Sequence, residues 1–463
     1  MKFDWANPYP TVRSPLFARN VVATSQPLAA QAGLRMLQAG GSAVDAAIAA
    51  AAAMTIVEPC SNGLGSDAFA LVWDGEQLLG LNASGTAPAA WDRAYFERRH
   101  GGQMAMRGWD SVTVPGAVAG WVALHARLGR LPFGDLLAPA IELAERGHGV
   151  GVITADKWQR AVPHLKDQPG FAQAFMPRGR APTPGERFVF AEAGATLRKI
   201  ADTRGEAFYR GEVAQALAAH AAAHGGAMTE TDLAGYAPSW VVPIGMDFGG
   251  HRLHEIPPNG QGIAALMAVG MLGHLDVGRF PGDSVAGKHL QSEAVRRACA
   301  DACRWVGDER AMTEVTAADL LDDGYLAERA RLIDPARAQA FDAGAPPRGG
   351  TIYLSTADER GMMVSFIQSN YMGFGSGIVV PGTGVSLQNR GHGFTTEAGH
   401  PNVVEPGKRP FHTIIPAFLT RDGAPVMSYG VMGGNMQPQG HLQTLVRMLV
   451  HGQQPQAACD APR

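Results

Sequence analysis

The sequence predicts an α+β protein in which a helix-rich first part precedes a strand-rich last part. Three observations predict this class. The 463 residues are 46% hydrophobic and 17% charged, which is typical of a globular chain with a large buried core. Helical periodicity prevails up to Gly307, and short apolar runs bounded by Gly and Pro prevail from Thr351 onward. At roughly 150 residues per domain the length suggests about two to four units, although one large body would also fit.

The first predicted elements are a short strand and two helices. Residues 20–25 (NVVATS) form the strand, and Ser25 can cap a helix that carries Pro27 in its first turn. Ser42 can cap a second helix, because its side-chain oxygen satisfies amide groups left free in the first turn. The Ala-rich residues 43–59 of that helix are too few to span a bilayer, so the helix is expected to be buried.

A glycine turn, a hairpin and a helical region come next. Residues 62–66 (NGLGS) are interpreted as a sharp structural turn, since the strand, turn and helix order of a phosphate-binding loop is missing. Asp74 and Gly75 join two strands in a hairpin. Residues 115–226 are mostly helical, and one of their helices is predicted to end at Gly147.

A helix, a connector and a series of strands complete the chain. Residues 285–307 form an amphipathic helix on which Arg296 and Arg297 are expected to face solvent. Residues 333–350 mix Pro, Gly, Ala and isolated charges without periodicity, which predicts a mobile connector. The runs of strand character that follow are 351–358, 361–369, 377–389, 413–420 and 424–434.

Charge and cysteine usage argue against several classes of protein. The formal net charge of -3 leaves no basic surplus for nucleic acid, and no basic amphipathic tract indicates a membrane partner. The first residues lack the apolar segment of a signal peptide, so a cytoplasmic location is expected. Neither a cofactor nor a metal is expected. Buried thiols, rather than a disulfide framework or metal ligands, are predicted for Cys60, Cys299, Cys303 and Cys459.

Thr351 begins the first strand after the connector, and this position has a chemical consequence. A threonine hydroxyl is a weak nucleophile unless a base lies beside it. Cleavage of the preceding peptide bond would give Thr351 a free α-amino group, with a pKa of roughly 7.7 to 8.0, that can take the hydroxyl proton. Gly350 would allow the strained backbone geometry that self-cleavage requires. On spacing alone, however, a threonine here is more simply a β-branched strand residue.

Seven ordered blocks provide the further signal. They are residues 23–51, 112–133, 136–150, 225–236, 351–369, 407–416 and 430–439. With these blocks the chain resembles the γ-glutamyltransferase family of N-terminal-nucleophile (Ntn) hydrolases from near its start to its last residue. An ordered set of this length is far less expected by chance than any single motif.

The resemblance implies a set of catalytic residues by position. Thr351 falls where the family has its processed nucleophile, so cleavage between Gly350 and Thr351 is implied. Ser369 falls where a second hydroxyl orients the nucleophile. Gly433 and Gly434 match the glycine pair whose backbone amides form the oxyanion hole, which stabilises the negative oxygen of an acyl-transfer transition state. The implied mechanism is acylation of the Thr351 hydroxyl, followed by attack of water or an acceptor amine.

The positions that bind the substrate differ from those of glutamyl-specific members. Ser84 stands in place of an arginine that clamps a carboxylate, and a serine cannot supply that bidentate pairing. Gly393 stands in place of an acidic residue, and Tyr371 in place of an asparagine. His412 and Thr413 replace a pair of serines. The resemblance therefore implies that the acylation machinery is retained and that γ-glutamyl recognition is weak or lost.

Two further residues are candidates for binding a different acyl group. Arg390 and His392 lie in the loop that faces the acyl pocket in relatives, where they could grip another acid or a dicarboxylate mono-amide. The alternatives are that Arg390 is a structural arginine and that His392 is a surface residue of a glycine turn. His412 can equally be a wall histidine with satisfied hydrogen bonds, and Arg409 is interpreted as part of the scaffold.

For the whole chain the resemblance implies a four-layer αββα sandwich made as one precursor. Residues 1–350 would form a large subunit and residues 351–463 a small subunit, intertwined in one domain. Relatives usually continue beyond this end, so a truncated small subunit is expected. A homodimer of such heterodimers is a further expectation.

The first choice of function is an Ntn amidohydrolase that acts on a small acyl amide, such as an oxamate-like or glutaryl amide. Its partners would be the amide and a water or amine acceptor, with no nucleic acid and no membrane. One alternative is a true γ-glutamyltransferase or glutathione hydrolase. An alternative of another class is an uncleaved, inactive relative that serves as a scaffold or binding protein.

Overall fold

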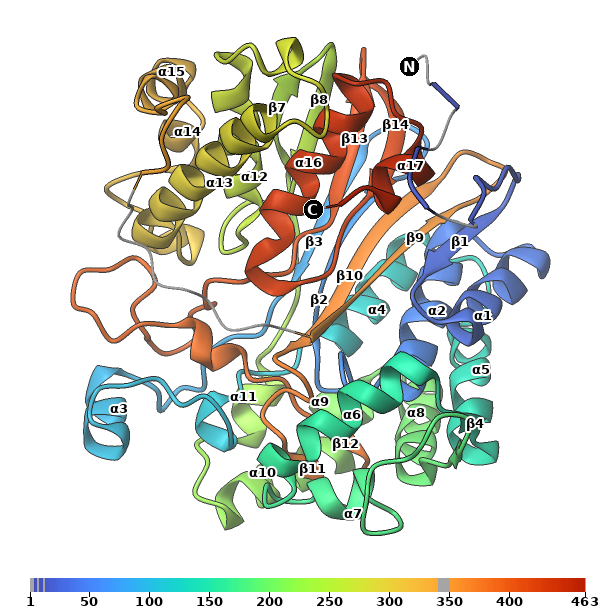
Figure 1. Cartoon of the computed structure of the whole chain (residues 1–463). Coiled ribbons are helices and arrows are strands. Elements are labelled where there is room, and N and C mark those ends of the chain that lie inside the picture. Colours follow the sequence, from blue (N-terminus) through green and yellow to red (C-terminus); the bar gives the residue numbers. More distant parts are fainter. Residues whose placement is uncertain (1–3, 6–7, 11–12, 340–349, 463) are drawn as a thin grey trace.

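The computed structural model describes residues 4–5, 8–10, 13–339 and 350–462. Two antiparallel sheets pack against each other, and helices cover the outer face of each sheet (Figure 1). This is the four-layer αββα arrangement, so the predicted fold class is confirmed. Among the described residues, no helix combines the length and the apolarity needed to cross a membrane.

The larger sheet mixes strands from the two ends of the chain. Its order is β1 (Val21–Thr24), β9 (Gly350–Ala357), β10 (Met363–Tyr371), β2 (Asp67–Trp73), β3 (Leu78–Ala83) and β6 (Ser239–Val241). Every neighbouring pair is antiparallel. Because β9 and β10 lie between β1 and β2, neither the first nor the last part of the chain builds this sheet alone.

The smaller sheet is mixed in the same way. Its order is β14 (Ala424–Tyr429), β13 (Ala417–Arg421), β8 (His251–Glu255) and β7 (Ile244–Phe248). A cluster of apolar side chains joins the two sheets and consists of Phe69, Leu71, Ile256, Ile367, Ile414 and Phe418. Strands β6, β7 and β8 were not predicted, because they are short and most of their residues are half-buried, which weakens the alternation of apolar and polar residues.

Three helices pack on the larger sheet: α1 (Pro27–Gln38), α2 (Ala43–Val57) and α4 (Ala117–Leu128). Helix α5 (Phe133–Arg146) packs on α2. All 15 residues of α2 are buried, as predicted. Ser42 caps this helix, since its Oγ accepts a hydrogen bond from Asp45 N at 3.2 Å and Asp45 Oδ2 accepts one from Ser42 N at 2.9 Å. Helices α12 (Gly262–Gly273), α13 (Val285–Trp305) and α16 (Gln437–Leu449) cover the smaller sheet.

Shorter elements surround these four layers. The helices are α3 (Arg93–His100), α6 (Val152–Leu165), α7 (Phe171–Phe175), α8 (Ala191–Thr203), α9 (Glu206–Tyr209), α10 (Glu212–Ala223), α11 (Glu230–Ala234), α14 (Ala317–Leu320), α15 (Asp323–Arg331) and α17 (Pro455–Asp460). The strands are β4 (His148–Gly149), β5 (Arg187–Phe188), β11 (Val379–Val380) and β12 (Val385–Ser386). The hairpin around residues 74–75 and the helix end at Gly147 are confirmed.

Several local predictions were wrong. Ser25 does not cap α1, because its Oγ instead donates to Glu58 Oε2 at 2.9 Å and Gln26 occupies the capping position. Arg297 does not face solvent: it is buried and donates to the carbonyl of Leu332. Of the cysteines only Cys60 is buried, whereas Cys299 is half-buried and Cys303 and Cys459 are exposed, since these three lie on partly solvated helix faces.

The predicted connector is seen only in part. Its residues 340–349 lie outside the described residues, so the prediction of mobility is not tested there. At its start Ile333 is buried against the helices of the smaller sheet. At its end Gly350 already belongs to β9, one residue before the predicted strand.

Candidate active site

Thr351 and Ser369 lie side by side in the larger sheet. Thr351 is the second residue of β9, and its Oγ1 lies 3.1 Å from Ser369 Oγ on β10. Both side chains are buried, with exposed fractions of 4% and 0%. Ser369 Oγ also accepts a hydrogen bond from Tyr371 N at 2.8 Å, which fixes its position. Among the described residues, Ser369 is the only recorded hydrogen-bond partner of the Thr351 hydroxyl.

A bulge in β10 determines this pairing. Gln368 pairs with Ile352, but the next registered pair is Tyr371 with Gly350, so the register shifts beside Thr351. Tyr371 has a φ of 76°, a left-handed conformation that is uncommon for a residue other than glycine. Because a bulge changes the direction of the side chains around it, the shift turns Ser369 towards Thr351.

The Gly433-Gly434 loop leaves the smaller sheet near the same end of β9. Ser428 of β14 contacts Ser355, and Gly430 packs on the ring of Tyr353. Later residues of β14 thus lie beside earlier residues of β9. The loop that follows β14 therefore continues towards the start of β9, where Thr351 lies.

Both glycines of this loop have positive φ, at 145° and 59°, which other residues rarely adopt. Gln261 holds the loop, since its Nε2 donates to Gly434 O at 2.8 Å. The positions predicted for the oxyanion hole therefore form a turn of two glycines with positive φ, held by Gln261.

Asp67 lies on the other side of Ser369. It is the first residue of β2, and its Cα is the registered partner of the Ser369 Cα. Its Oδ1 accepts a hydrogen bond from Gly116 N at 3.2 Å, and its Oδ2 lies 3.1 Å from His412 Nε2. Burial raises the pKa of Asp67 to about 7, although the positive charge of Arg390 opposes this increase.

His412 is held as a neutral ring. Its Nδ1 accepts a hydrogen bond from Ile414 N at 3.4 Å, so the proton belongs on Nε2, which donates to Asp67. Burial lowers the pKa of His412 well below its usual range, and the nearby charge of Arg390 adds to this effect. The interpretation of His412 as a wall histidine with both ring nitrogens engaged therefore fits its surroundings.

Arg390 is a buried cation with unused hydrogen-bond donors. It begins a short 3₁₀ turn, Arg390–Gly393, and only 1% of its surface is exposed. Its Nη1 donates to Thr413 Oγ1 at 2.8 Å, and its guanidinium carbon lies 4.7 Å from the centre of the Tyr371 ring. Its Nε and Nη2 have no hydrogen-bond partner among the described residues. Burial lowers the pKa of Arg390 to about 10.

The remaining predicted positions fall into two groups. His392 is half-buried beside Tyr371, at 6.4 Å between ring centres, and burial lowers its pKa. Ser84, by contrast, is tied into the scaffold, because its Oγ accepts from Asn259 Nδ2 at 3.0 Å and its carbonyl accepts from Arg409 Nε at 3.1 Å. The structure thus brings Arg390 and His392 together around Tyr371 and gives Ser84 only scaffold contacts.

Gly393 has no room for the acidic side chain of glutamyl-specific relatives. A Cβ atom added there would approach the carbonyl oxygen of Phe411 to 2.6 Å. The glycine turn before β2 is similarly close-packed, since a Cβ on Gly65 would approach Ser386 O to 2.6 Å. The interpretation of that turn as structural therefore agrees with its packing.

Asp67 was not predicted as a site residue. A local signal was present: an acidic residue opens the otherwise apolar strand DAFALVW directly after the glycine turn. Its pairing with Ser369 depends on β2 and β10 becoming neighbours, which no local pattern reveals.

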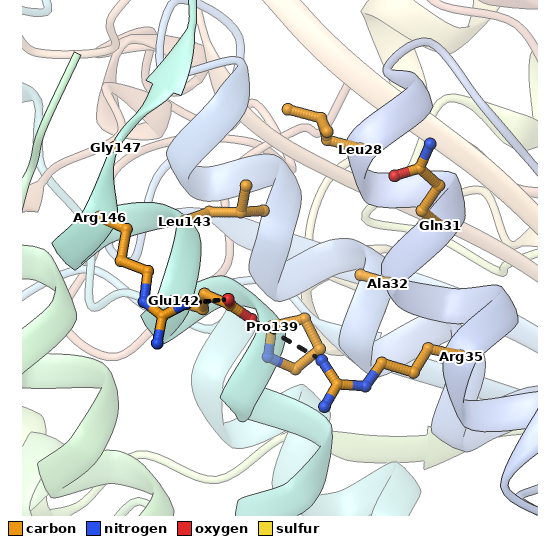
Figure 2. A pocket seen from close by; sticks show the side chains of 9 residues that line it. All are labelled: Leu28, Gln31, Ala32, Arg35, Pro139, Glu142, Leu143, Arg146 and Gly147. Carbon is orange, nitrogen blue, oxygen red and sulfur yellow. Dashed lines mark hydrogen bonds and ion pairs between the residues drawn. The ribbon is translucent and has the colours of Figure 1, made fainter. Parts of the chain in front are cut away.

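A separate hollow lies between α1 and α5 (Figure 2). Glu142 lies in its wall and pairs with Arg146 at 3.0 Å and with Arg35 at 3.8 Å. The residues that line it include no hydroxyl or thiol side chain and none of the predicted site residues. This hollow therefore has no nucleophile with which to act on an amide.

Comparison with known proteins places this geometry in a family. The family model described as Gamma-glutamyltranspeptidase matches residues 29–463. A glutathione hydrolase-like proenzyme of Bacillus subtilis (strain 168) is 35% identical over 455 residues, or 97% of this chain and 86% of that protein. The oxamate amidohydrolase proenzyme of Klebsiella pneumoniae is 37% identical over 445 residues, or 94% of this chain and 83% of that protein.

A solved structure is similar over a comparable length. The crystal structure of cephalosporin acylase from Bacillus halodurans matches with a TM-score of 0.93 and 47% sequence identity, covering 99% of this chain and 85% of that chain. The resemblance carried by the seven sequence blocks is therefore confirmed. This protein is an Ntn amidohydrolase and belongs to the gamma-glutamyltranspeptidase family.

Proposed function

We propose that this protein cleaves its own chain before Thr351 and then hydrolyses a small acyl amide through an acyl-enzyme on the Thr351 hydroxyl. The pairing of the two buried hydroxyls of Thr351 and Ser369, at 3.1 Å, carries this proposal. No His, Lys, Asp or Glu among the described residues is hydrogen-bonded to Thr351. Cleavage at Gly350 would supply the missing base, because the new α-amino group belongs to the nucleophilic residue itself.

In the proposed reaction the Thr351 oxygen attacks the amide carbon, and the α-amino group takes the hydroxyl proton. Backbone amides of Gly433 and Gly434 would stabilise the negative oxygen of the tetrahedral intermediate. The carbon–nitrogen bond then breaks, and the amine leaves with that proton. Water, or an acceptor amine, attacks the resulting ester, which releases the acyl group and restores the hydroxyl.

The names of the relatives support processing into two subunits. The glutathione hydrolase-like and oxamate amidohydrolase relatives are both called proenzymes. Here residues 1–350 would form the large subunit and residues 351–463 the small one. Both sheets combine strands from these two ranges, which supports a heterodimer that stays assembled after the cut.

We further propose that the acyl group is small and is not a γ-glutamyl group. Ser84 makes only scaffold contacts, and Gly393 has no space for an acidic side chain, so two groups that would hold a glutamyl moiety are missing. Relatives named oxamate amidohydrolase and cephalosporin acylase support other acyl groups on this fold. A true glutathione hydrolase remains the second candidate, because the relative from Bacillus subtilis is named as glutathione hydrolase-like.

The first test is whether Thr351 becomes a chain terminus. Denaturing electrophoresis of the purified protein is expected to show fragments of 350 and 113 residues (463 minus 350), and sequencing of the smaller one should read Thr-Ile-Tyr-Leu. Thr351→Ala should give one intact band and lower amide turnover by about 10³-fold or more, since the nucleophile and its amine are both lost. Thr351→Ser is the matched control, because it keeps a hydroxyl and should still be cleaved.

A panel of γ-glutamyl anilide, glutaryl amides and oxamate then identifies the acyl group. We expect turnover of a non-glutamyl amide and little turnover of the γ-glutamyl anilide. An intact single band for the wild-type protein, or full turnover by Thr351→Ala, would contradict the proposal.

A further inference from the structure

Arg390 has an unusual position for a cation. It is buried, yet Nε and Nη2 of its guanidinium donate to no described residue. Buried donors are normally paired, because an unpaired polar group away from water is costly. A guanidinium with two adjacent free N–H groups matches the two oxygens of a carboxylate.

A closed chain of contacts links this cation to the nucleophile. Ser369 contacts Thr351 and accepts from Tyr371 N, and the Tyr371 ring lies under Arg390. Arg390 donates to Thr413, whose neighbour in the chain, His412, pairs with Asp67. Asp67 is again the registered partner of Ser369. Arg390 and Asp67 therefore lie within one small buried region around Thr351.

Two buried side chains of opposite charge lie in this region when the site is empty. Arg390 contributes one positive charge and an ionised Asp67 one negative charge, whereas His412 is neutral because its Nδ1 accepts a hydrogen bond. The positive charge of Arg390 acts on Asp67, although the two side chains form no recorded hydrogen bond. A substrate carboxylate bonded to Arg390 would neutralise the positive charge that now favours ionised Asp67 and would add a negative charge near it, and both changes favour protonation of Asp67.

We propose that Arg390 binds the carboxylate of an acid-bearing acyl group, and that Asp67 takes up one proton from solvent when this carboxylate arrives. This inference rests on the proposed function and names its substrate class: mono-amides of short dicarboxylic acids. Asp67 is the resident counter-ion of Arg390 in the empty site, and the substrate carboxylate replaces it. Protonation converts the Asp67 carboxylate into a neutral acid that can keep its contacts with Gly116 and His412.

The other side chains that face Asp67 do not compete for this proton. His412 has its Nδ1 engaged, and burial together with Arg390 lowers its pKa. Arg409 also acts on Asp67 but is already a cation bonded to the scaffold. Tyr209 and Tyr236 are buried phenols whose pKa values burial raises, so they stay neutral. Among these side chains Asp67 is thus the one that can change its charge. The α-amino group that processing gives Thr351 also titrates in this range, with a pKa of roughly 7.7 to 8.0, so the Asp67→Asn variant is needed to distinguish the two proton acceptors.

The first experiment measures how strongly the enzyme recognises the acid. The rates kcat/KM are compared for oxamate, malonamate, succinamate and glutaramate, each against the amide in which a methyl group replaces the carboxylate. For at least one chain length the wild-type enzyme should prefer the acid by about 100-fold, as expected for a buried, bonded charge pair. Arg390→Gln should lose this preference, so that the ratio of its rates on the acid and on the neutral amide falls towards one.

The matched control is Arg409→Gln. Arg409 also acts on Asp67, but its donors bond the scaffold at Ser84 and Ser239, so the ratio of acid to neutral rates should not change. An unchanged ratio in Arg390→Gln, or an equal loss of ratio in Arg409→Gln, would overturn the assignment of Arg390.

The second experiment counts protons and needs no variant. Calorimetric titration of processed wild-type enzyme with the matching dicarboxylate, at pH 8 in two buffers of different ionisation enthalpy, should show uptake of close to one proton per ligand. Asp67→Asn should bind the ligand without proton uptake. Binding with no uptake by the wild-type enzyme would overturn the role of Asp67, and absence of binding by every dicarboxylate would overturn the whole inference.

These results can be separated from the proposed function itself. If the wild-type protein shows no fragment beginning at Thr351, the proposed function fails. If it is cleaved and turns over neutral amides at least as fast as acids, only the present inference fails. If Arg390→Gln is not cleaved, Arg390→Lys takes its place. This variant retains the charge without the bidentate geometry, so it should show a reduced acid preference. Proton uptake by the wild-type enzyme tests the role of Asp67 without either variant.

Discussion

Asp67 carries a carboxyl group that does not contact water, because its side chain is wholly buried at the start of β2. Its hydrogen bonds from Gly116 and His412 favour the ionised form, whereas burial favours the neutral form. Burial prevails and raises the pKa to about 7, from an ordinary value of 3.8. The group is therefore a source of pH-dependent stability as well as a proposed proton acceptor.

The sign of this dependence follows from the raised pKa. The folded state binds the Asp67 proton more tightly than the unfolded state, so its stabilising contribution is complete below about pH 4 and is lost as the pH rises through about 7. Asp67→Asn cannot ionise. Its free energy of unfolding relative to wild type should therefore rise by an amount on the order of 2 to 4 kcal/mol between pH 4 and pH 8. Urea unfolding of both proteins across this range measures the difference.

Asp308 provides a control with the opposite sign. Burial tends to raise its pKa, but hydrogen bonds from Arg310 and from the Arg409 backbone amide outweigh this and hold the pKa below its ordinary value. Its contribution is present above about pH 4 and is lost as the pH falls further, so Asp308→Asn should lose stability relative to wild type as the pH rises through about 4. A parallel response of both variants would contradict this account of Asp67.

At the scale of elements, α2 depends on its first turn. Ser42 Oγ accepts from Asp45 N and also donates to Leu128 O at 3.0 Å, so one buried hydroxyl both caps α2 and joins it to the end of α4. Ser42→Ala should therefore lower the free energy of unfolding by about 1 to 2 kcal/mol. Thr316 caps the short, exposed α14 through the same kind of capping box, and Thr316→Ala should cost about 0.5 kcal/mol or less. Equal losses in the free energy of unfolding of the two variants, measured with denaturant, would show that burial of the capping residue does not affect its contribution.

Elements with strong local signals were predictable from the sequence. The cap at Ser42, the hairpin after β2 and the helix end at Gly147 each depend on a few adjacent residues. Ser25 was mistaken for a cap because its hydroxyl is taken by Glu58, which only the packing of α1 on α2 brings near. Arg297 looked solvated because its hydrogen-bond partner, the carbonyl of Leu332, is distant in the chain.

In the candidate active site, too, features set by adjacent residues were predictable and contacts between distant residues were not. The predictions for Thr351, Ser369, Gly433 and Gly434 came from the family blocks, since these positions belong to continuous motifs. The pairing of Asp67 with Ser369 depends on sheet register, and the contact of Arg390 with Tyr371 depends on the packing of a turn against β10; no motif encodes either one. Contacts between segments that are distant in the chain were therefore the part of the site that the sequence did not predict.

At the scale of the whole molecule, the two proposed subunits share both sheets. β9 and β10 lie between β1 and β2, and β13 pairs with β8 (Figure 1). Separation of the subunits would expose these strand edges and the apolar cluster between the sheets. The cut protein should therefore elute as one species in native gel filtration and unfold in a single denaturant transition. Elution of a separate small subunit in native buffer would contradict this expectation.

A second consequence concerns the end of the chain that processing would create. Chain ends usually fray, and a frayed amine could not stay beside its hydroxyl. Here β10 flanks β9 from Gly350 onward, and β1 joins on the other side from Leu354, only three residues beyond Thr351. Thr24 Oγ1 also donates a hydrogen bond to the Tyr353 carbonyl oxygen at 3.1 Å. The new amino terminus would thus be held by strand pairing close to Thr351, as residues inside a sheet are, and it would be ordered before any ligand binds.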